Sequence, residues 1–111
     1  MTTVLIDDAR SFRDERLCLV ARSSRAGVRL LADLHGTRID ALWLDHDLAS
    51  GDTIWPVIRL LGTAATDGHP YDIGVIHLHA SHHRHAHEMA EALHGAGYVT
   101  ERSLSPGVWR H

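Results

Sequence analysis

Residues 42–47 read Leu-Trp-Leu-Asp-His-Asp, an apolar run that ends in two carboxylates and an imidazole. The same design recurs at residues 4–8, Val-Leu-Ile-Asp-Asp, and at residues 73–79, where Ile-Gly-Val-Ile leads into His-Leu-His. Short apolar runs of this kind are typical of buried parallel strands. The sequence therefore predicts three strands, each with polar side chains at its carboxyl end.

Helical patterns lie between and after these strands, at residues 23–36, 56–62 and 82–95. Three signals mark the boundaries of these helices: serines that can cap the first helix, a proline in the first turn of the second, and a glycine at the end of each. Weaker patterns predict strands at 18–21 and around 98–100. This alternation predicts an α/β fold with an open, mostly parallel sheet of about five strands and helices on both faces.

Two segments depart from the alternation. Only nine residues separate Asp8 from Cys18, fewer than the dozen or so that a parallel crossover normally needs, so we expect the first helix to be short or missing. Residues 63–71 are predicted to form a surface loop, and residues 105–107 a turn before Trp109, which we expect to pack locally. The length of 111 residues fits a single domain, residues 1–111.

Composition excludes several classes of protein. With 11 arginines against 14 acidic residues and a formal charge of −3, the chain lacks the positive field that coating duplex DNA requires. It has no lysine for Schiff-base chemistry or a P-loop, and its single cysteine, Cys18, can form no intramolecular disulfide. Asp7 and Asp8 stand where a signal peptide needs apolar residues, and no apolar run approaches the roughly 20 residues of a membrane span. We therefore expect a cytoplasmic protein with no membrane contact.

The predicted strand ends bring titratable side chains together. In an open parallel sheet, ligands bind beyond the carboxyl ends of the strands, at the point where the strand order reverses. A lone aspartate there is often only a helix cap, but crowded carboxylates repel one another unless a cation or a proton joins them. The side chains predicted to meet at this edge are Asp7, Asp8, Asp45, His46, Asp47, His77 and His79.

His77 and His79 are two residues apart, so both rings leave the same face of a strand and can reach one metal ion or one phosphate. The alternative is that one ring is satisfied in the core while the other caps a loop. A mixed set of aspartates and histidines favours manganese or zinc, with magnesium possible. Such an ion acidifies bound water or polarises a phosphoryl oxygen.

Two further residues are candidates for binding a phosphate. Arg10 follows the acidic pair and either grips a phosphate in a bidentate fork or is a solubilising surface residue. His82 stands at the start of the last helix, whose N-terminal amides point at the predicted crevice. His85 and His87 flank the apolar stripe of that helix and are expected to face water.

Residues 6–10, 44–48 and 76–79 resemble the three signatures of the cyclic-phosphate-processing receiver-like domain, a branch of the response-regulator receiver superfamily. Arg22, Ser23, Thr53 and Met89 extend the resemblance, which covers roughly residues 4–93. It implies a three-layer, flavodoxin-like fold whose acidic pocket has gained histidines for hydrolysing or binding cyclic phosphates. The residues that match the metal pocket are Asp7, Asp8 and Asp45, and those that match the additions are His46, Asp47, His77 and His79.

Our first hypothesis is a metal-dependent phosphoesterase that opens a cyclic nucleotide or an RNA 2′,3′-cyclic phosphate end with a metal-activated water. The predicted metal ligands of this enzyme are Asp7, Asp8, Asp45 and His79. The catalytic candidates are His77 as a ligand or proton donor, His79, and His46 or Asp47 as groups that orient the others. The candidates for binding the substrate are Arg10, Thr53 and His82.

The second hypothesis is a non-catalytic receiver-like module that binds a metal or a phosphorylated or cyclic-nucleotide ligand for signalling. A phosphorelay receiver with Asp45 as phosphoacceptor is a related alternative, but that chemistry normally relies on a lysine, which this chain lacks. In each case the expected partner is a small phosphorylated ligand or an RNA end. The sequence favours no oligomeric state.

Overall fold

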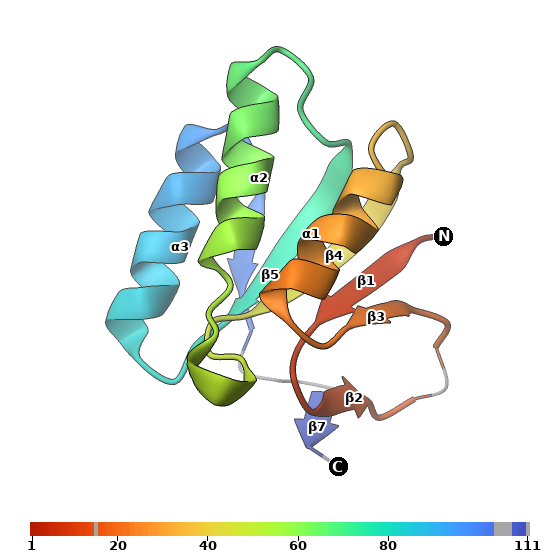
Figure 1. Cartoon of the computed structure of the whole chain (residues 1–111), viewed down its shortest axis with the longest axis vertical. Coiled ribbons are helices and arrows are strands. Elements are labelled where there is room, and N and C mark those ends of the chain that lie inside the picture. Colours follow the sequence, from red (N-terminus) through yellow and green to blue (C-terminus); the bar gives the residue numbers. More distant parts are fainter. Residues whose placement is uncertain (15, 104–107, 111) are drawn as a thin grey trace.

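The computed structural model describes residues 1–14, 16–103 and 108–110, the last three by their backbone only. Its main sheet has the order β3-β1-β4-β5-β6, and every neighbouring pair is parallel (Figure 1). The strands are β1 (Thr3–Ile6), β3 (Leu19–Ala21), β4 (Ile39–Asp45), β5 (Ile73–His79) and β6 (Thr100–Arg102). The predicted receiver-like fold with a parallel sheet of about five strands is confirmed. The strand order reverses at β1 and β4, which places the expected ligand crevice beyond their carboxyl ends.

The helices are α1 (Ser24–Asp33), α2 (Trp55–Thr66) and α3 (His83–Gly95), with a short 3-10 helix, η1 (Ala49–Gly51), before α2. Ser23 caps α1 as predicted, because its side chain accepts a hydrogen bond from the backbone N–H of Ala26. The predicted end of α2 at Gly62 is wrong. The helix runs on to Thr66, since a glycine inside a helix costs only about 1 kcal/mol, and the chain turns at Gly68, where φ is +83°. The first part of the predicted loop 63–71 is therefore helical.

The connection from β1 to β3 contains no helix in the part of it that the structure describes, as the sequence predicts. It contains β2 (Arg10–Phe12), which pairs antiparallel with β7 (Val108–Arg110), a contact that the sequence analysis missed. The last strand of the main sheet, Thr100–Arg102, is centred two residues later than the predicted segment 98–100. The predicted turn at residues 105–107 and the side chain of Trp109 lie outside the described part of the chain.

All three helices cover one face of the sheet (Figure 1). The sequence predicts helices on both faces, and over the described residues this distribution is not found. The reason is that crossovers are right-handed: α1, α2 and α3 each connect strands that advance in one direction, from β3 towards β6. Only the connection from β1 to β3 runs the other way, and its described residues contain no helix to place on the second face. A non-helical layer covers that face instead, with Phe12 packed on Leu5 and Trp43.

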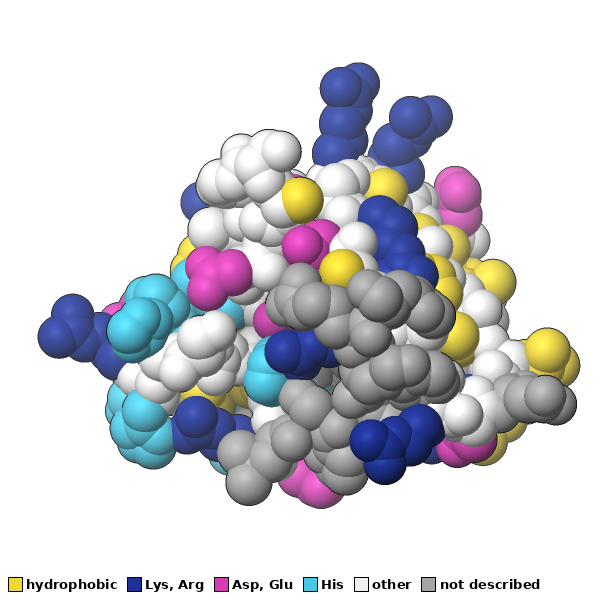
Figure 2. Space-filling view, turned by 90° about the horizontal axis from the view of Figure 1, so that it is seen from below, with side chains coloured by type: hydrophobic (Ala, Val, Ile, Leu, Met, Phe, Trp, Pro, Cys, Tyr) yellow, Lys and Arg dark blue, Asp and Glu magenta, His cyan; other side chains and the backbone are white. Residues whose placement is uncertain are grey.

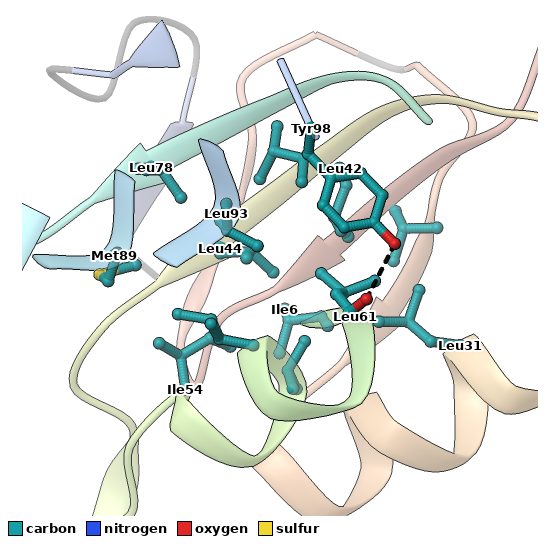
Figure 3. Packing of buried hydrophobic residues seen from close by; sticks show 14 of the residues in the cluster. Ile6, Leu31, Leu42, Leu44, Ile54, Leu61, Leu78, Met89, Leu93 and Tyr98 are labelled. Carbon is teal, nitrogen blue, oxygen red and sulfur yellow. Dashed lines mark hydrogen bonds between the residues drawn. The ribbon is translucent and has the colours of Figure 1, made fainter. Parts of the chain in front are cut away.

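The main core lies between the sheet and the helices (Figure 3). Alternate strand residues point into it, such as Ile6, Leu44 and Leu78, because successive side chains of a strand face opposite sides. Tyr98 closes one end of this core and is 6% exposed. No helix within the described ranges has the length and apolar character needed to cross a membrane.

Replacing Tyr98 with phenylalanine should lower the free energy of unfolding by about 1–3 kcal/mol. The buried hydroxyl donates to the carbonyl of Leu61 at 3.0 Å and accepts from the backbone N–H of Tyr71 at 3.1 Å, so its loss leaves that buried N–H without this acceptor (Figure 3). Denaturant unfolding measures the change. The neighbouring Val99→Ala variant is the control, because Val99 is 60% exposed and its truncation should cost no more than about 0.5 kcal/mol. Equal losses in both variants would contradict the argument.

Candidate functional site

Three carboxylates meet at the carboxyl ends of β1 and β4. Ile6 pairs with Leu44 in the sheet, so Asp7, directly after β1, lies beside Asp45 at the end of β4. Asp8 completes the group, which we call the carboxylate trio, and one oxygen of each side chain lies within 4.8 Å of the others. The structure thus brings together three of the predicted metal ligands at the point where the strand order reverses. Figure 2 looks onto this end of the molecule, where acidic side chains lie near the middle and histidines gather to one side.

Hydrogen bonds between side chains and the backbone hold the loop that carries Asp7 and Asp8. Oδ1 of Asp7 accepts the N–H of Ala9 at 3.0 Å and that of Arg10 at 2.8 Å. From the start of the first helical connection, the guanidinium of Arg22 donates to the carbonyl oxygens of Asp7, at 3.2 Å, and Arg10, at 2.6 Å. Asp7 and Arg22 therefore fix the turn that presents Asp8 and Arg10 at the edge of the sheet.

The electrostatics of the trio fit a cation. Burial, followed by repulsion from Asp7, raises the pKa of Asp45 to about 7, while the charge of Arg10 acts in the opposite direction. Oδ1 of Asp8 is buried and has no hydrogen-bond partner among the residues that the structure describes. A divalent cation would ligate this oxygen and offset the repulsion between the carboxylates. The residues present thus form a reasonable set of ligands for one ion.

A small cavity of about 10 Å³, the room of one water molecule, adjoins the trio. Its polar lining comes from Asp7, Arg10, Asp45, His77 and His79, with Ser103 at one side. His79 lies beside Asp45 across the β4–β5 pair, and its Nδ1 is 3.4 Å from the carbonyl oxygen of Ser103. Burial, with a contribution from Arg10, lowers the pKa of His79 below 6.5, so the ring is neutral at pH 7.

His77 and His79 share one face of β5, as predicted, but they have different surroundings. His77 stands two residues earlier on the strand, about 7 Å further from the edge of the sheet. Its ring stacks on Trp43 with the centroids 3.9 Å apart and an angle of 21° between the planes. Burial lowers the pKa of His77, against an opposing effect of Glu101 on β6. His77 thus forms the apolar wall of the cavity rather than its carboxylate end.

His46 and Asp47 turn away from the trio. Nδ1 of the buried His46 lies 3.0 Å from Oδ1 of Asp47, and its ring stacks on His85 of α3 with centroids 4.0 Å apart and planes at 15°. Ligating atoms of these three side chains lie within 4.8 Å of one another. We call this second group the histidine trio. It lies on the helical side of the sheet, because Asp45 and His46 are consecutive and point to opposite faces.

The prediction that His85 faces water is wrong, whereas the same prediction is confirmed for His87. His85 is half-buried and its Nδ1 is buried, while His87 is exposed and pairs with Glu91 at 3.1 Å. The sequence contained a signal for the burial of His85. His85, Met89 and Leu93 are spaced four residues apart and therefore lie on one side of the helix, and the last two are fully buried.

The three predicted substrate-binding residues occupy different places. Arg10 lines the cavity beside the carboxylate trio. Thr53 forms a single antiparallel bridge with Asp47, so it belongs to the surroundings of the histidine trio. His82 is the exposed N-cap residue of α3 and contacts the ring of His85 edge-on, at 5.4 Å between centroids. Only Arg10 is therefore placed next to the carboxylates.

Comparison with known protein families identifies the family of the chain. The family model described as the cyclic-phosphate processing receiver domain matches residues 2–95, a stretch that contains both trios and the residues of the cavity up to His79. A search of curated proteins finds no significant match. Since the family model covers most of the chain, the protein belongs to the cyclic-phosphate processing receiver domain family.

Proposed function

We propose that the protein is a metal-dependent phosphoesterase that hydrolyses a cyclic phosphate, either a cyclic nucleotide or an RNA 2′,3′-cyclic phosphate end. The observation that carries the proposal is the carboxylate trio, two of whose members, Asp7 and Asp45, line a cavity together with Arg10 and His79. A cation site beside a guanidinium suits a phosphodiester, whose two non-bridging oxygens can then be held from two sides. Membership of the family supports the link to cyclic phosphates.

The proposed metal ligands are Asp7, Asp8 and Asp45, with His79 as a further ligand on the side of β5. A trio of oxygen donors suits Mg²⁺ or Mn²⁺, and an added imidazole favours Mn²⁺. When bound, the ion would polarise a phosphoryl oxygen and lower the pKa of a water molecule. These residues sit on a short, braced loop and on strand ends, which are rigid supports for such a site.

The side chains around the trio have separate tasks in the proposed reaction. Arg10 would bind the non-bridging oxygens of the phosphate. His77, whose pKa is lowered by burial, would take a proton from the attacking water and return it to the departing ester oxygen, because His79 is assigned to the ion. One P–O bond forms and one ring P–O bond breaks, so the product is an open phosphomonoester.

The cavity also limits how a substrate binds. At about 10 Å³ it accommodates groups the size of a water molecule, so a sugar and a base must lie outside it. A substrate would therefore present its phosphate at the mouth of the cavity, with the sugar and the base further out. The proposed partner is a small phosphorylated ligand or an RNA end, and the proposed compartment is the cytoplasm, whose reducing conditions suit the lone thiol of Cys18.

A panel of substrates tests the proposal. Tag-free protein is incubated with 2′,3′-cyclic nucleotides, 3′,5′-cyclic nucleotides and cyclic dinucleotides in the presence of Mn²⁺, Mg²⁺ or Zn²⁺, and the products are separated by chromatography. We expect a linear phosphomonoester from at least one class, and EDTA should abolish its formation. Thermal stabilisation by a ligand without any product would favour the non-catalytic alternative.

Replacing Arg10 with alanine should raise the KM for a cyclic phosphate about tenfold or more, since a hydrogen bond to a charged group is worth about 1.5–3 kcal/mol. The assay uses saturating Mn²⁺, because the charge of Arg10 acts on Asp45 and its loss would also change metal binding. Arg13→Ala is the matched control, since Arg13 is exposed and does not line the cavity. An unchanged KM in Arg10→Ala would remove Arg10 from the proposed substrate site.

A further inference from the structure

We propose that the protein forms a symmetric dimer in which β3 pairs antiparallel with β3 of a second copy, so that the two main sheets join into one. The proposal does not depend on the phosphoesterase function, because β3 contributes no residue to the carboxylate trio or to the cavity beside it.

The two edge strands of the main sheet differ in their side chains. On one side the sheet ends with β6, which carries the exposed and charged residues Glu101 and Arg102. On the other side it ends with β3, whose residues Leu19–Ala21 are all apolar and the first two exposed (Figure 1). Charged side chains protect an edge strand from pairing with another chain, and an apolar edge without them is a template for such pairing. The edge formed by β3 is therefore the one suited to a partner strand.

Exposed apolar side chains gather at this edge. Of the large hydrophobic residues that are exposed in the described part of the chain, all except Val99 lie in β3 or beside it: Met1, Leu17, Leu19 and Val20. Together they present roughly 500 Å² of surface, as much as the largest apolar patch of a typical monomer. A symmetric contact would bury about 1,000 Å² in total, which is the size of a weak but specific interface.

The backbone of β3 determines how a second copy can pair. The carbonyl oxygen of Ala21 accepts the N–H of Asp7 at 3.1 Å, so Ala21 and Leu19 direct their polar groups at β1. Successive residues of a strand direct these groups to opposite sides, so those of Val20, and of Cys18 just before β3, are directed at the open edge. In an antiparallel pair centred on Leu19, Val20 of each copy exchanges two hydrogen bonds with Cys18 of the other. This register uses every outward group of the segment.

The same register brings apolar side chains together on both faces of the joined sheet. Leu19 lies beside Val4, a member of the main core, so the two copies of Leu19 would meet on the helical face. Val20 would lie opposite Cys18 on the other face, where Cys18 packs against Leu5 and its neighbours. Because the strands run antiparallel, the two carboxylate trios would lie at opposite ends of the joined sheet.

Two arginines flank the paired segment, and this register places Arg16 of one copy opposite Arg22 of the other. The guanidinium of Arg16 donates two hydrogen bonds of 2.7 Å to the carboxylate of Asp14. The guanidinium of Arg22 donates to the carbonyl oxygens of Asp7 and Arg10 in its own chain. The positive charge of Arg16 is therefore already paired, which reduces the repulsion at the ends of the contact.

Sedimentation velocity of the full, tag-free chain, from low micromolar to near-millimolar concentration, tests the proposal. We expect the mass to rise with concentration towards that of two chains. Leu19→Lys sets two like charges opposite each other at the centre of the contact and should weaken dimerisation at least about tenfold. Val20→Pro removes an N–H that faces the open edge, keeps the pairing with β1, and should have the same effect. Circular dichroism checks that both variants fold.

Val99→Lys is the matched control, because Val99 is exposed beside the opposite edge strand, β6. Its dimerisation should equal that of the wild type. A wild type that stays monomeric at every concentration would overturn the proposal, and so would an equal loss of dimer in Val99→Lys and Leu19→Lys.

A cross-link tests the register. In the double variant Cys18→Ser, Leu19→Cys the two new thiols would lie directly opposite each other, with Cα atoms about 4.5 Å apart, which a disulfide can bridge. Mild oxidation should therefore give a covalent dimer. The wild type should not cross-link through Cys18, whose copies would be diagonal neighbours about 7–8 Å apart. Failure of the double variant to cross-link at concentrations where the wild type is dimeric would overturn the pairing of β3 with β3.

Discussion

Replacing Asp8 with asparagine is expected to lower the affinity for Mn²⁺ by at least about 100-fold, with a matching loss of cyclic-phosphate hydrolysis at limiting Mn²⁺. Among the described residues, the buried Oδ1 of Asp8 has no hydrogen-bond partner, so no described contact of this oxygen needs the carboxylate. Outer partners of a metal site already cost 10–100-fold when removed, and a ligand should cost at least as much. Titration of EDTA-treated protein, followed by electron paramagnetic resonance of free Mn²⁺, measures the affinity.

The matched control for Asp8→Asn is Asp33→Asn, which removes one negative charge from an exposed position at the end of α1. Its Mn²⁺ affinity should stay within about twofold of the wild type, because an exposed charge far from the site is screened by salt. Unfolding experiments should show that Asp8→Asn without metal is at least as stable as the wild type, since the substitution relieves repulsion in the trio. A wild-type Mn²⁺ affinity in Asp8→Asn would place the metal elsewhere.

The two trios have a common structural origin at the end of β4. Asp45 and His46 are consecutive, so their side chains leave opposite faces of the sheet. One face has the non-helical layer and supplies carboxylates from β1, while the other has α3 and supplies His85. One strand end therefore contributes to the carboxylate trio on one side and to the histidine trio on the other.

The sequence predicted the central strands well because they leave a simple apolar pattern, and β1, for example, is buried at every position. Helix positions were also predictable from caps and from helical spacing, with Ser23 as the clearest case. The distribution of the helices over the two faces was not predicted, because it depends on the handedness of each crossover and on the missing helix after β1. The pairing of β2 with β7 joins residues about 100 positions apart and has no local signal.

The carboxylate trio was predictable because all three residues follow strands that the sequence located, and parallel strands end at one edge. The division of the polar residues into two trios could not be predicted from the sequence. It depends on the face of the sheet to which each side chain points after the strand has ended. His46 and Asp47 lie in that turning segment. His85 was misjudged because its polarity was given more weight than its spacing from Met89, which placed it on the buried side of α3.

Asp45→Asn should stabilise the metal-free protein against unfolding, by an amount that grows with pH. Burial and neighbouring carboxylates raise the folded-state pKa of Asp45 to about 7, compared with 3.8 in the unfolded chain. Between these values the folded protein keeps a proton that the unfolded chain has lost. The stability that Asp45 contributes is therefore complete below about pH 4 and falls as the pH rises, until it levels off above about pH 7.

The test compares variants because His77 and His79 also make the stability depend on pH. Their pKa values are lowered in the folded protein, so their effect on stability has the opposite sign and increases as the pH rises. The difference in Tm between Asp45→Asn and the wild type cancels these histidine effects to first order. In EDTA we expect this difference to be small near pH 4 and largest above pH 7, while Asp33→Asn should show no such trend. Adding Mn²⁺ at pH 8 should raise the Tm of the wild type much more than that of Asp45→Asn, because a cation offsets the repulsion only where the carboxylate is present. A difference in Tm that did not vary with pH would mean that Asp45 has the same pKa in the folded and unfolded protein, and the crowding of charges that supports the metal site would then be absent.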